Sequence, residues 1–368
     1  MNLPAASDIA TFCGIRSPKE LTIAITGACN LVCRHCLVGS GVVSSAPHVP
    51  LHSIIRLLDE LASLGGEGIR ITGGEPLCHH GWLDILSHAR SNGFQRIALQ
   101  TNGMLLDGTS AEALRRLDFP GLSIQISLDG SCEEHHDFVR GTGSFERAVR
   151  GIRFLGEAGL AGRVSIFFTE MAHNLEDIPE LLELAAGLGV RSVSSGTLVR
   201  SGRAASFSAM RPPMPAQYQR LIERYAGDEH FRNRYRLIGT VAALEWFTSP
   251  TPRTECCTFA ENPYITPRGT LYPCLMCHVD NFSVGDVFEK GLAASLAEGA
   301  AQWSSLMQIS HCRVDAIAEC RNCPGRSLCG GGCMGRAWGS HGDLLSADDR
   351  CEVRRLIYTD TGGVSPPP

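Results

Sequence analysis

The sequence lacks the features that mark membrane, exported and nucleic-acid-binding proteins. It has no apolar run long enough to cross a membrane, and no basic run long enough to make nucleic acid the main partner. Met1–Ser7 lacks a basic segment followed by an apolar core, so no secretory signal is expected there. We therefore expect a cytoplasmic protein with no membrane and no nucleic-acid partner.

Cysteine is missing from the middle of the chain. The 368 residues include 16 cysteines, but none lies between positions 133 and 255. Disulfides are not expected, because the cytosol keeps thiols reduced. Two groups of thiols near the two ends of the chain indicate metal ligation. With 43% hydrophobic and 19% charged residues, the chain is long enough for two or three domains with a stable core.

The first group of thiols is Cys29, Cys33 and Cys36, spaced three and then two residues apart. Zinc structural sites and electron-carrying cubane clusters take four protein ligands. Three ligands in one loop, with no fourth cysteine nearby, leave one metal position open. An open position distinguishes catalytic metal sites from structural ones, so this loop is the candidate catalytic centre.

Short β-rich runs alternate with helical stretches from Leu21 onward, which predicts parallel strands joined by right-handed crossovers. Six such units suit a partial (β/α)6 barrel like a TIM barrel, and a doubly wound open sheet is the alternative. The helical stretches begin near Leu51, His80, Ser110, Ser144, Leu175 and Pro215. The predicted strands are Leu21–Thr26, Gly68–Thr72, Arg96–Gln100, Leu122–Ser127, Val164–Thr169 and Ser192–Val199.

Unusual loops follow the first four predicted strands. They are the cysteine loop, Gly73–Pro76, Thr101–Gly103 and Asp129–Gly130. Loops that follow the strands of such a barrel share one face, and that face carries the chemistry. The four loops therefore predict one site.

The cysteine triad, followed after the next strand by Gly73-Gly74-Glu75-Pro76, resembles the radical S-adenosylmethionine (radical SAM) enzymes. The resemblance implies a [4Fe–4S] cluster on Cys29, Cys33 and Cys36, whose open iron binds S-adenosylmethionine. Reductive cleavage of that molecule to a 5′-deoxyadenosyl radical would start hydrogen abstraction from the substrate, which makes the protein an oxidoreductase. The cofactor-binding residues that this resemblance implies are His35, Gly73, Gly74, Glu75, Pro76, Ser127, Asp129 and Arg140. Asn102 is a turn residue by propensity, but its place on the active face makes it a candidate contact of the cofactor or substrate. The candidate catalytic residues are Asn102 and Arg203.

The C-terminal cysteines resemble the SPASM extension of radical SAM enzymes, which carries two auxiliary [4Fe–4S] clusters. The resemblance assigns one cluster to Cys320, Cys323, Cys329 and Cys351, and the other to Cys257, Cys274 and Cys333. Cys256 and Cys277 are possible further ligands of the second. Cys274-x2-Cys277-His278 also fits covalent haem c attachment, but that normally needs an exported chain. Zinc pairs remain another alternative, although the two Cys-x2-Cys pairs are farther apart than in the usual zinc ribbon.

These assignments predict five parts of the chain. Residues 1–20 are a lead-in, 21–230 the barrel, 231–255 a linker, 256–358 a small cysteine-rich iron–sulfur domain, and 359–368 a disordered tail. Pro-rich segments at Arg211–Pro215 and Ser249–Pro252 place the end of the barrel between them.

Relatives with this extension mostly modify peptides, so the leading hypothesis is a maturase that oxidatively modifies or crosslinks a ribosomal peptide or protein. A low-potential electron donor of flavodoxin or ferredoxin type is the expected partner. The region before Leu21 is too short for a peptide-recognition domain, so either such a domain is another protein or the barrel alone binds the substrate.

Three alternatives stay open for the activity. One is a formylglycine maturase of the anaerobic sulfatase type, but relatives of that type have Asp where this chain has Leu275. A second is the synthesis of a haem or quinone cofactor. A third, of another class, is a non-catalytic iron–sulfur electron carrier, which would have no use for the S-adenosylmethionine loops.

Overall fold

The computed structural model describes residues 18–41, 46–248 and 262–360. One ten-stranded sheet runs through these parts in the order β10-β9-β8-β1-β2-β3-β4-β5-β6-β7. Strands β1 to β7 are parallel, and each is the neighbour of the next in sequence. A doubly wound sheet would reverse its order at a switch point. The expected partial barrel is confirmed, and the open-sheet alternative is wrong.

The six predicted strands are present with ends that shift by at most two residues. They are β1 Glu20–Ala24, β2 Gly68–Thr72, β3 Arg96–Thr101, β4 Leu122–Ser127, β5 Val164–Glu170 and β6 Ser192–Thr197. The intervening helices are α2 Leu51–Ser63, α3 Trp82–Ser91, α4 Gly108–Arg116, α5 Glu133–Arg140, α6 Ser144–Glu157, α7 Ile178–Gly187, α8 Arg203–Ser206 and α9 Pro215–Gly227.

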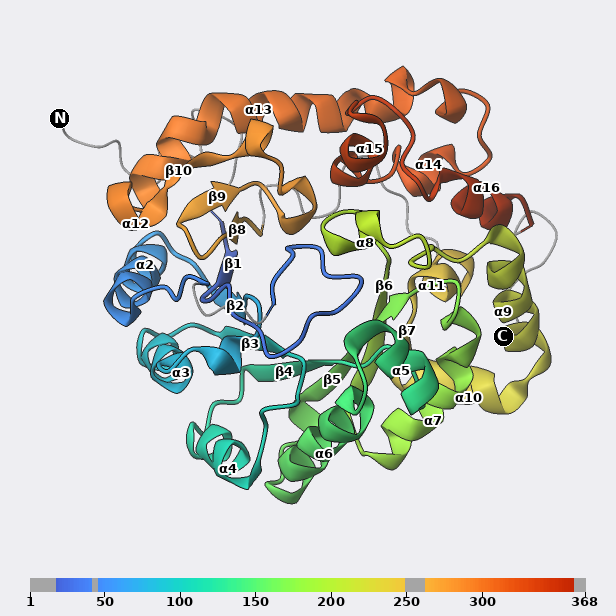
Figure 1. Cartoon of the computed structure of the whole chain (residues 1–368). Helices are drawn as coiled ribbons and strands as arrows, with labels where there is room; N and C mark the ends of the chain where they lie inside the picture. The colour runs from blue at the N-terminus through green and yellow to red at the C-terminus, as the bar shows by residue number, and fades with distance from the viewer. Residues whose placement is uncertain (1–17, 42–45, 249–261, 361–368) are drawn as a thin grey trace.

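Helices α2, α3, α4, α6 and α7 lie around the outside of the curved sheet (Figure 1). Helix α2 shows why: Ile54, Leu57, Leu58 and Leu61 recur at helical spacing and are fully buried. Burial of each such side chain stabilises the fold by about 1.5–3 kcal/mol. The loop after β1, drawn in blue, lies on the inner side of the curved sheet, where the ends of the parallel strands converge (Figure 1).

The segment predicted to be a linker, 231–255, is structured over its described part. Its first residues belong to helix α10 Glu229–Ile238. Strand β7 Gly239–Thr240 then pairs with β6, and helix α11 Ala242–Thr248 follows. Aromatic residues hold these elements to the barrel, since Phe231 and Tyr235 pack edge-on against Tyr225 of α9. The remainder of that segment, the second Pro-rich segment and the expected tail from 361 onward lie outside the described residues, as do residues 1–17 of the lead-in.

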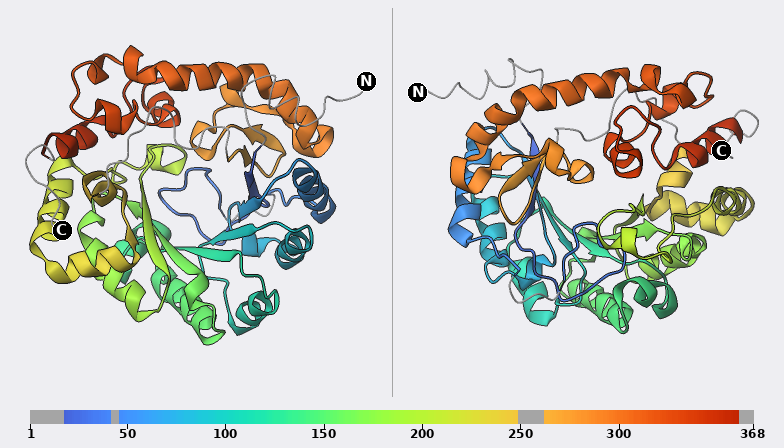
Figure 2. Two further views of the ribbon diagram at one scale, coloured as in Figure 1. Left: turned by 180° about the vertical axis from the view of Figure 1, so that it is seen from behind. Right: turned by 45° about the horizontal axis from the view of Figure 1, so that its top comes forward.

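The C-terminal part extends the barrel sheet. Strand β8 Tyr264–Ile265 pairs with β1, and β9 Thr270–Tyr272 and β10 Val284–Asp286 follow it antiparallel. Its helices are α12 Val287–Lys290, α13 Leu292–Ala316, α14 Arg326–Cys329, α15 Met334–His341 and α16 Cys351–Asp360. The long α13 spans the top of the molecule from β10 to α14 (Figures 1 and 2). None of the helices in the described parts is long and apolar enough to cross a membrane.

Candidate active site

The cysteine loop is held in place from the far end of the sheet. Arg203, at the start of α8, donates from Nε to the Cys33 carbonyl at 2.8 Å and from Nη1 to the Gly39 carbonyl at 3.0 Å. It also donates to the Ser40 carbonyl. Gly202 lies so close that a Cβ there would be 2.4 Å from the Cys36 carbonyl oxygen. In this structure Arg203, expected to be a catalytic candidate, is therefore a clamp on the loop.

Gly73 and Gly74 allow the second loop to dock on the first. The Gly74 and Glu75 amides each donate at 2.8 Å, to the carbonyls of Thr26 and Ala28. Gly73 has φ +147°, and a Cβ there would lie 2.4 Å from the Thr26 oxygen. The close approach that requires glycine is thus to the cysteine loop itself.

Glu75 is fully buried and ties the loops after β2 and β3 together. One carboxylate oxygen accepts from the Thr101 hydroxyl at 2.7 Å and the Leu77 amide at 3.1 Å, and the other from the Asn102 amide at 2.7 Å. Burial raises the pKa of Glu75, and these three hydrogen bonds oppose the rise. Pro76 is buried at the start of the short 3₁₀ turn that follows.

Asn102 links this network to the first thiol. Its side-chain nitrogen, Nδ2, lies 2.7 Å from Asn30 Oδ1 and 3.9 Å from Cys29 Sγ. The Leu31 amide donates to the same sulfur at 3.4 Å. Burial raises the pKa of Cys29 to about 12, and the Leu31 hydrogen bond opposes the rise. N–H groups directed at this sulfur would stabilise the thiolate, which is the form that binds metal.

Asp129 and Arg140, expected to contact the cofactor separately, form a buried ion pair. Arg140 Nε donates to Asp129 Oδ2 at 2.6 Å, and His35 Nε2 lies 3.2 Å from the same oxygen. Burial acts to raise the pKa of Asp129, but the charges of Arg140 and His35 hold it well below its usual value. Ser127 lies two residues before Asp129, at the end of β4, and is half-buried.

The C-terminal set predicted from the pattern comes together in space. Cys320, Cys323, Cys329 and Cys351 lie near enough to interact electrostatically, although they come from four different turns and helix ends. Burial, followed by the neighbouring thiols, raises the pKa of Cys320 to about 11.

Cys274 and Cys333 also lie near one another, with Cys277 beside them. Cys256 and Cys257 lie outside the described residues. Within 18–41, 46–248 and 262–360, no three His, Cys, Asp or Glu side chains are arranged to hold a single metal ion.

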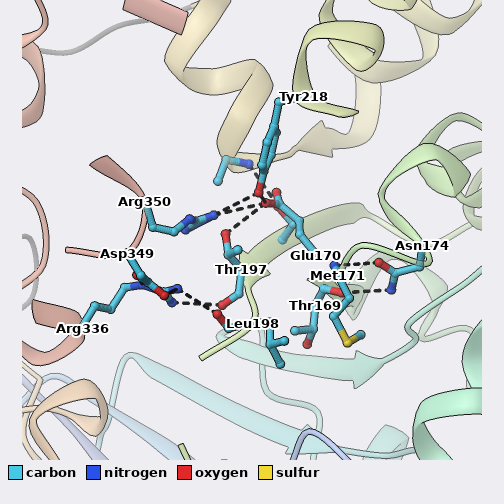
Figure 3. Close-up of polar contacts among 12 residues, drawn as sticks. Thr169, Glu170, Met171, Asn174, Thr197, Leu198, Tyr218, Arg336, Asp349 and Arg350 are labelled. Carbon is cyan, nitrogen blue, oxygen red and sulfur yellow. Dashed lines mark hydrogen bonds and ion pairs between the residues drawn. The ribbon is translucent and has the colours of Figure 1, made fainter. Parts of the chain in front are cut away.

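The sequence analysis missed a polar network between the barrel and the C-terminal part (Figure 3). Glu170, at the end of β5, accepts hydrogen bonds from Tyr218 at 2.8 Å and Arg350 at 3.3 Å. Arg336 of α15 donates to the carbonyls of Thr197 and Leu198 after β6, at 3.1 and 2.8 Å. Their position along the chain could have revealed them. Glu170 and Thr197 end the fifth and sixth strands, and the other site residues follow the first four strands in the same way.

Two family models match the chain. The radical SAM superfamily covers residues 23–185, and an iron–sulfur cluster-binding domain, SPASM, covers residues 256–324. A mycofactocin maturase, MftC, of Mycobacterium tuberculosis is 28% identical over 92% of this chain and 84% of the relative. A haem synthase of Methanosarcina barkeri, described as AdoMet-dependent, is also 28% identical, over 92% of this chain and 97% of the relative.

Solved structures show the same fold. The anSMEcpe structure with bound AdoMet has a TM-score of 0.73 at 16% identity, and covers 93% of this chain and 96% of that one. The Streptococcus suis SuiB structure with its precursor peptide SuiA has a TM-score of 0.69 at 17% identity, covering 94% and 79%. A radical SAM domain binds a [4Fe–4S] cluster and S-adenosylmethionine, and a SPASM domain binds auxiliary iron–sulfur clusters. The chain is a radical SAM enzyme with a C-terminal SPASM domain.

Proposed function

We propose that this enzyme oxidatively modifies or crosslinks a peptide made by the ribosome. The names of the relatives support a peptide substrate, because they include mycofactocin maturases and structures solved with bound peptides. The haem synthases of similar identity make a haem-related substrate the second candidate.

Cys29, Cys33 and Cys36 are the proposed ligands of the catalytic cluster. N–H donors reach Cys29, and although burial raises the pKa of Cys33, the nearby Arg140 charge opposes the rise and would favour an anionic group there. We assign one auxiliary cluster to Cys320, Cys323, Cys329 and Cys351, and the other to Cys257, Cys274 and Cys333. His35, Gly73, Gly74, Glu75, Pro76, Asn102, Ser127, Asp129 and Arg140 remain the proposed cofactor-binding residues.

When bound, the cluster and S-adenosylmethionine supply a 5′-deoxyadenosyl radical that abstracts hydrogen from an unactivated C–H bond. The protein holds the reactants and excludes water. Because both Glu75 oxygens are occupied by Thr101, Asn102 and Leu77, this carboxylate positions the loops. Free backbone groups of the Gly73–Glu75 loop would then be the ones to receive the cofactor's amino group.

A cavity of about 560 Å³ beside the cysteine loop supports the peptide reading most directly. It lies between Gly27, Gly73 and the β8–β9 hairpin, and its described lining includes Tyr264, Tyr272 and His278, with one arginine, Arg268, and one carboxylate, Asp280. Mixed polarity with aromatic walls suits a peptide segment. A tetrapyrrole with several carboxylates would call for several cations. The formylglycine alternative is disfavoured because this chain has Leu275 where relatives of that type have Asp.

A flavodoxin- or ferredoxin-type donor would supply the electron, and a separate protein would present the peptide. The cytoplasm, which keeps thiols reduced, is the proposed location. A non-catalytic electron carrier is the alternative of another class.

The test uses anaerobically reconstituted protein, dithionite and S-adenosylmethionine. Formation of 5′-deoxyadenosine by the wild type, and its loss in a Cys29/Cys33/Cys36→Ala variant, is the expected result. A fully loaded wild type that forms none, with or without candidate substrates, would refute the radical assignment. Mass spectrometry of candidate precursor peptides then tests the substrate: crosslinking removes a pair of hydrogen atoms. Conversion of a carboxylated tetrapyrrole instead would establish the second candidate.

A further inference from the structure

Three Cys-x2-Cys turns in this chain share one backbone hydrogen bond. In each, the amide of the second cysteine donates to the carbonyl of the first: Cys36 to Cys33 at 3.3 Å, Cys323 to Cys320 at 3.3 Å, and Cys277 to Cys274 at 3.1 Å. In the first two turns both cysteines are proposed cluster ligands. In the third, only Cys274 has that assignment, although Cys277 occupies the equivalent position.

The third turn brings its two thiols together in the protein interior. Cys274 and Cys277 are 4% and 1% exposed, and their thiols lie near enough for Cys274 to act on Cys277. Both belong to the short turn around η4 Leu275–Cys277. Cys277 therefore points to the same side of the turn as an assigned ligand.

Helix α15 brings a third thiol to the same place. Cys333 is the N-cap of α15 and lies near enough to Cys277 to affect it electrostatically. The first turn of α15 is packed so tightly on η4 that a Cβ at Gly335 would lie 2.3 Å from the Met276 carbonyl oxygen. Because Met276 lies between Cys274 and Cys277, this contact sets Cys333 against both.

A buried free cysteine is more often a small apolar core residue than a ligand. Cys277 differs from such a residue in its neighbours. It faces two thiols already assigned to a cluster, and the fully buried Arg313 guanidinium is near enough to act on it. The neighbouring Cys274 thiol and burial raise the pKa of Cys277, and the Arg313 charge opposes the rise. Three thiols gathered around one buried point are the donor set that an iron–sulfur cluster requires.

We propose that Cys277 is a protein ligand of the auxiliary cluster that Cys274 and Cys333 hold. The inference rests on the proposed assignment of that cluster. Adding Cys277 to the three ligands of that assignment makes four, which is the number a cubane takes when it only carries electrons. This cluster then has no iron open to substrate, and its role is electron transfer.

The experiment uses the full chain, reconstituted anaerobically, in a Cys29/Cys33/Cys36→Ala background that removes the catalytic cluster. Iron, sulfide and the EPR spectrum of the reduced protein are measured for this background and for added Cys277→Ala, Cys277→Ser and Cys312→Ala. The background should hold about eight irons, the content of two cubanes. Cys312, an exposed thiol outside every assigned set, is the matched control and should change nothing.

A ligand role predicts that Cys277→Ala loses up to about four irons or gains a new EPR spectrum. It also predicts that Cys277→Ser, whose oxygen can bind iron, keeps more iron with shifted signals. If Cys277 only packs in the core, Cys277→Ala should instead keep more iron than Cys277→Ser, since Ala is the milder change at an apolar site.

Unchanged iron and EPR in Cys277→Ala would overturn the inference while leaving the proposed assignment intact. A background protein with only about four irons, or a Cys274→Ala variant that keeps the full content, would instead refute the assignment of the cluster, and the inference with it.

Discussion

Arg350 donates to the Glu170 carboxylate at 3.3 Å across 180 residues of sequence, and both side chains are buried. Glu170 ends β5 of the barrel, whereas Arg350 precedes Cys351, a proposed auxiliary ligand. The ion pair therefore connects the active face of the barrel to an auxiliary cluster site (Figure 3).

Replacing Glu170 by Gln should destabilise the protein by about 3 kcal/mol, because a buried charge then loses its counterion. Burial lowers the pKa of Arg350, and the charges of Tyr218 and Glu170 oppose this shift. The measurement is the urea midpoint of unfolding. Glu180→Gln is the control: Glu180 pairs with Arg224 at 2.7 Å on the surface, and its loss should cost less than about 1 kcal/mol. Equal midpoints for the two variants would contradict this account.

Arg203→Lys should loosen the cysteine loop without unfolding the barrel. Lysine cannot reproduce the fork that reaches the Cys33, Gly39 and Ser40 carbonyls. Loss of one charged hydrogen bond, worth about 1.5–3 kcal/mol, should speed the release of iron to a chelator at least about tenfold. Arg200→Lys, an exposed change three residues away, should release iron at the wild-type rate. If Arg203→Lys lost activity but kept its iron, the catalytic role would be favoured over the clamp.

Acid should destabilise the protein through His136. Its Nδ1 accepts from the Asp129 amide at 3.0 Å, so the folded state requires a neutral ring, and burial lowers the pKa of His136 to about 4. Because the unfolded state binds the proton near pH 6.5, stability is lost as the pH falls from 6.5 toward 4. Between pH 7 and 5 the wild type should lose about 2 kcal/mol more than His136→Asn, whose side chain does not titrate. Chemical unfolding at both values checks this, and parallel losses would count against it.

Arg313→Gln should lower the reduction potentials of the auxiliary clusters. Arg313 is fully buried, donates to the Gly331 carbonyl at 2.7 Å, and acts electrostatically on both Cys277 and Cys320. A positive charge between the two sites stabilises the more negative, reduced clusters. Its removal should lower a potential by about 60 mV, equivalent to 1.4 kcal/mol for one electron. EPR-monitored titration measures this, with exposed Arg321→Gln as a control that solvent should screen. A shift of equal size in both variants would argue against a specific role for Arg313.

The sequence by itself determined the strands, their order and the face that carries the site. These follow from local information: apolar periodicity within each run, and turn residues between runs. Gly68–Thr72 and Leu122–Ser127 were predicted to the residue, and helices α2, α6 and α9 begin at the expected positions. Convergence of the loops then follows from parallel topology alone. The segment expected to be a linker is helical over much of its described part, because α10 and α11 are held by aromatic contacts with α9, which a local pattern does not contain.

Only the tertiary structure decided what the individual side chains touch. Asp129 and Arg140 could each have faced a ligand, but the fold pairs them. Arg203 became a clamp because β6 ends near the cysteine loop, and Glu170 met Arg350 because the C-terminal part folds back onto β5. The contacts of Arg203 and Glu170 join residues more than a hundred positions apart, and the Asp129–Arg140 pair joins the loop after β4 to the end of helix α5. They depend on how helices and sheet pack in three dimensions, which no local pattern in the sequence specifies.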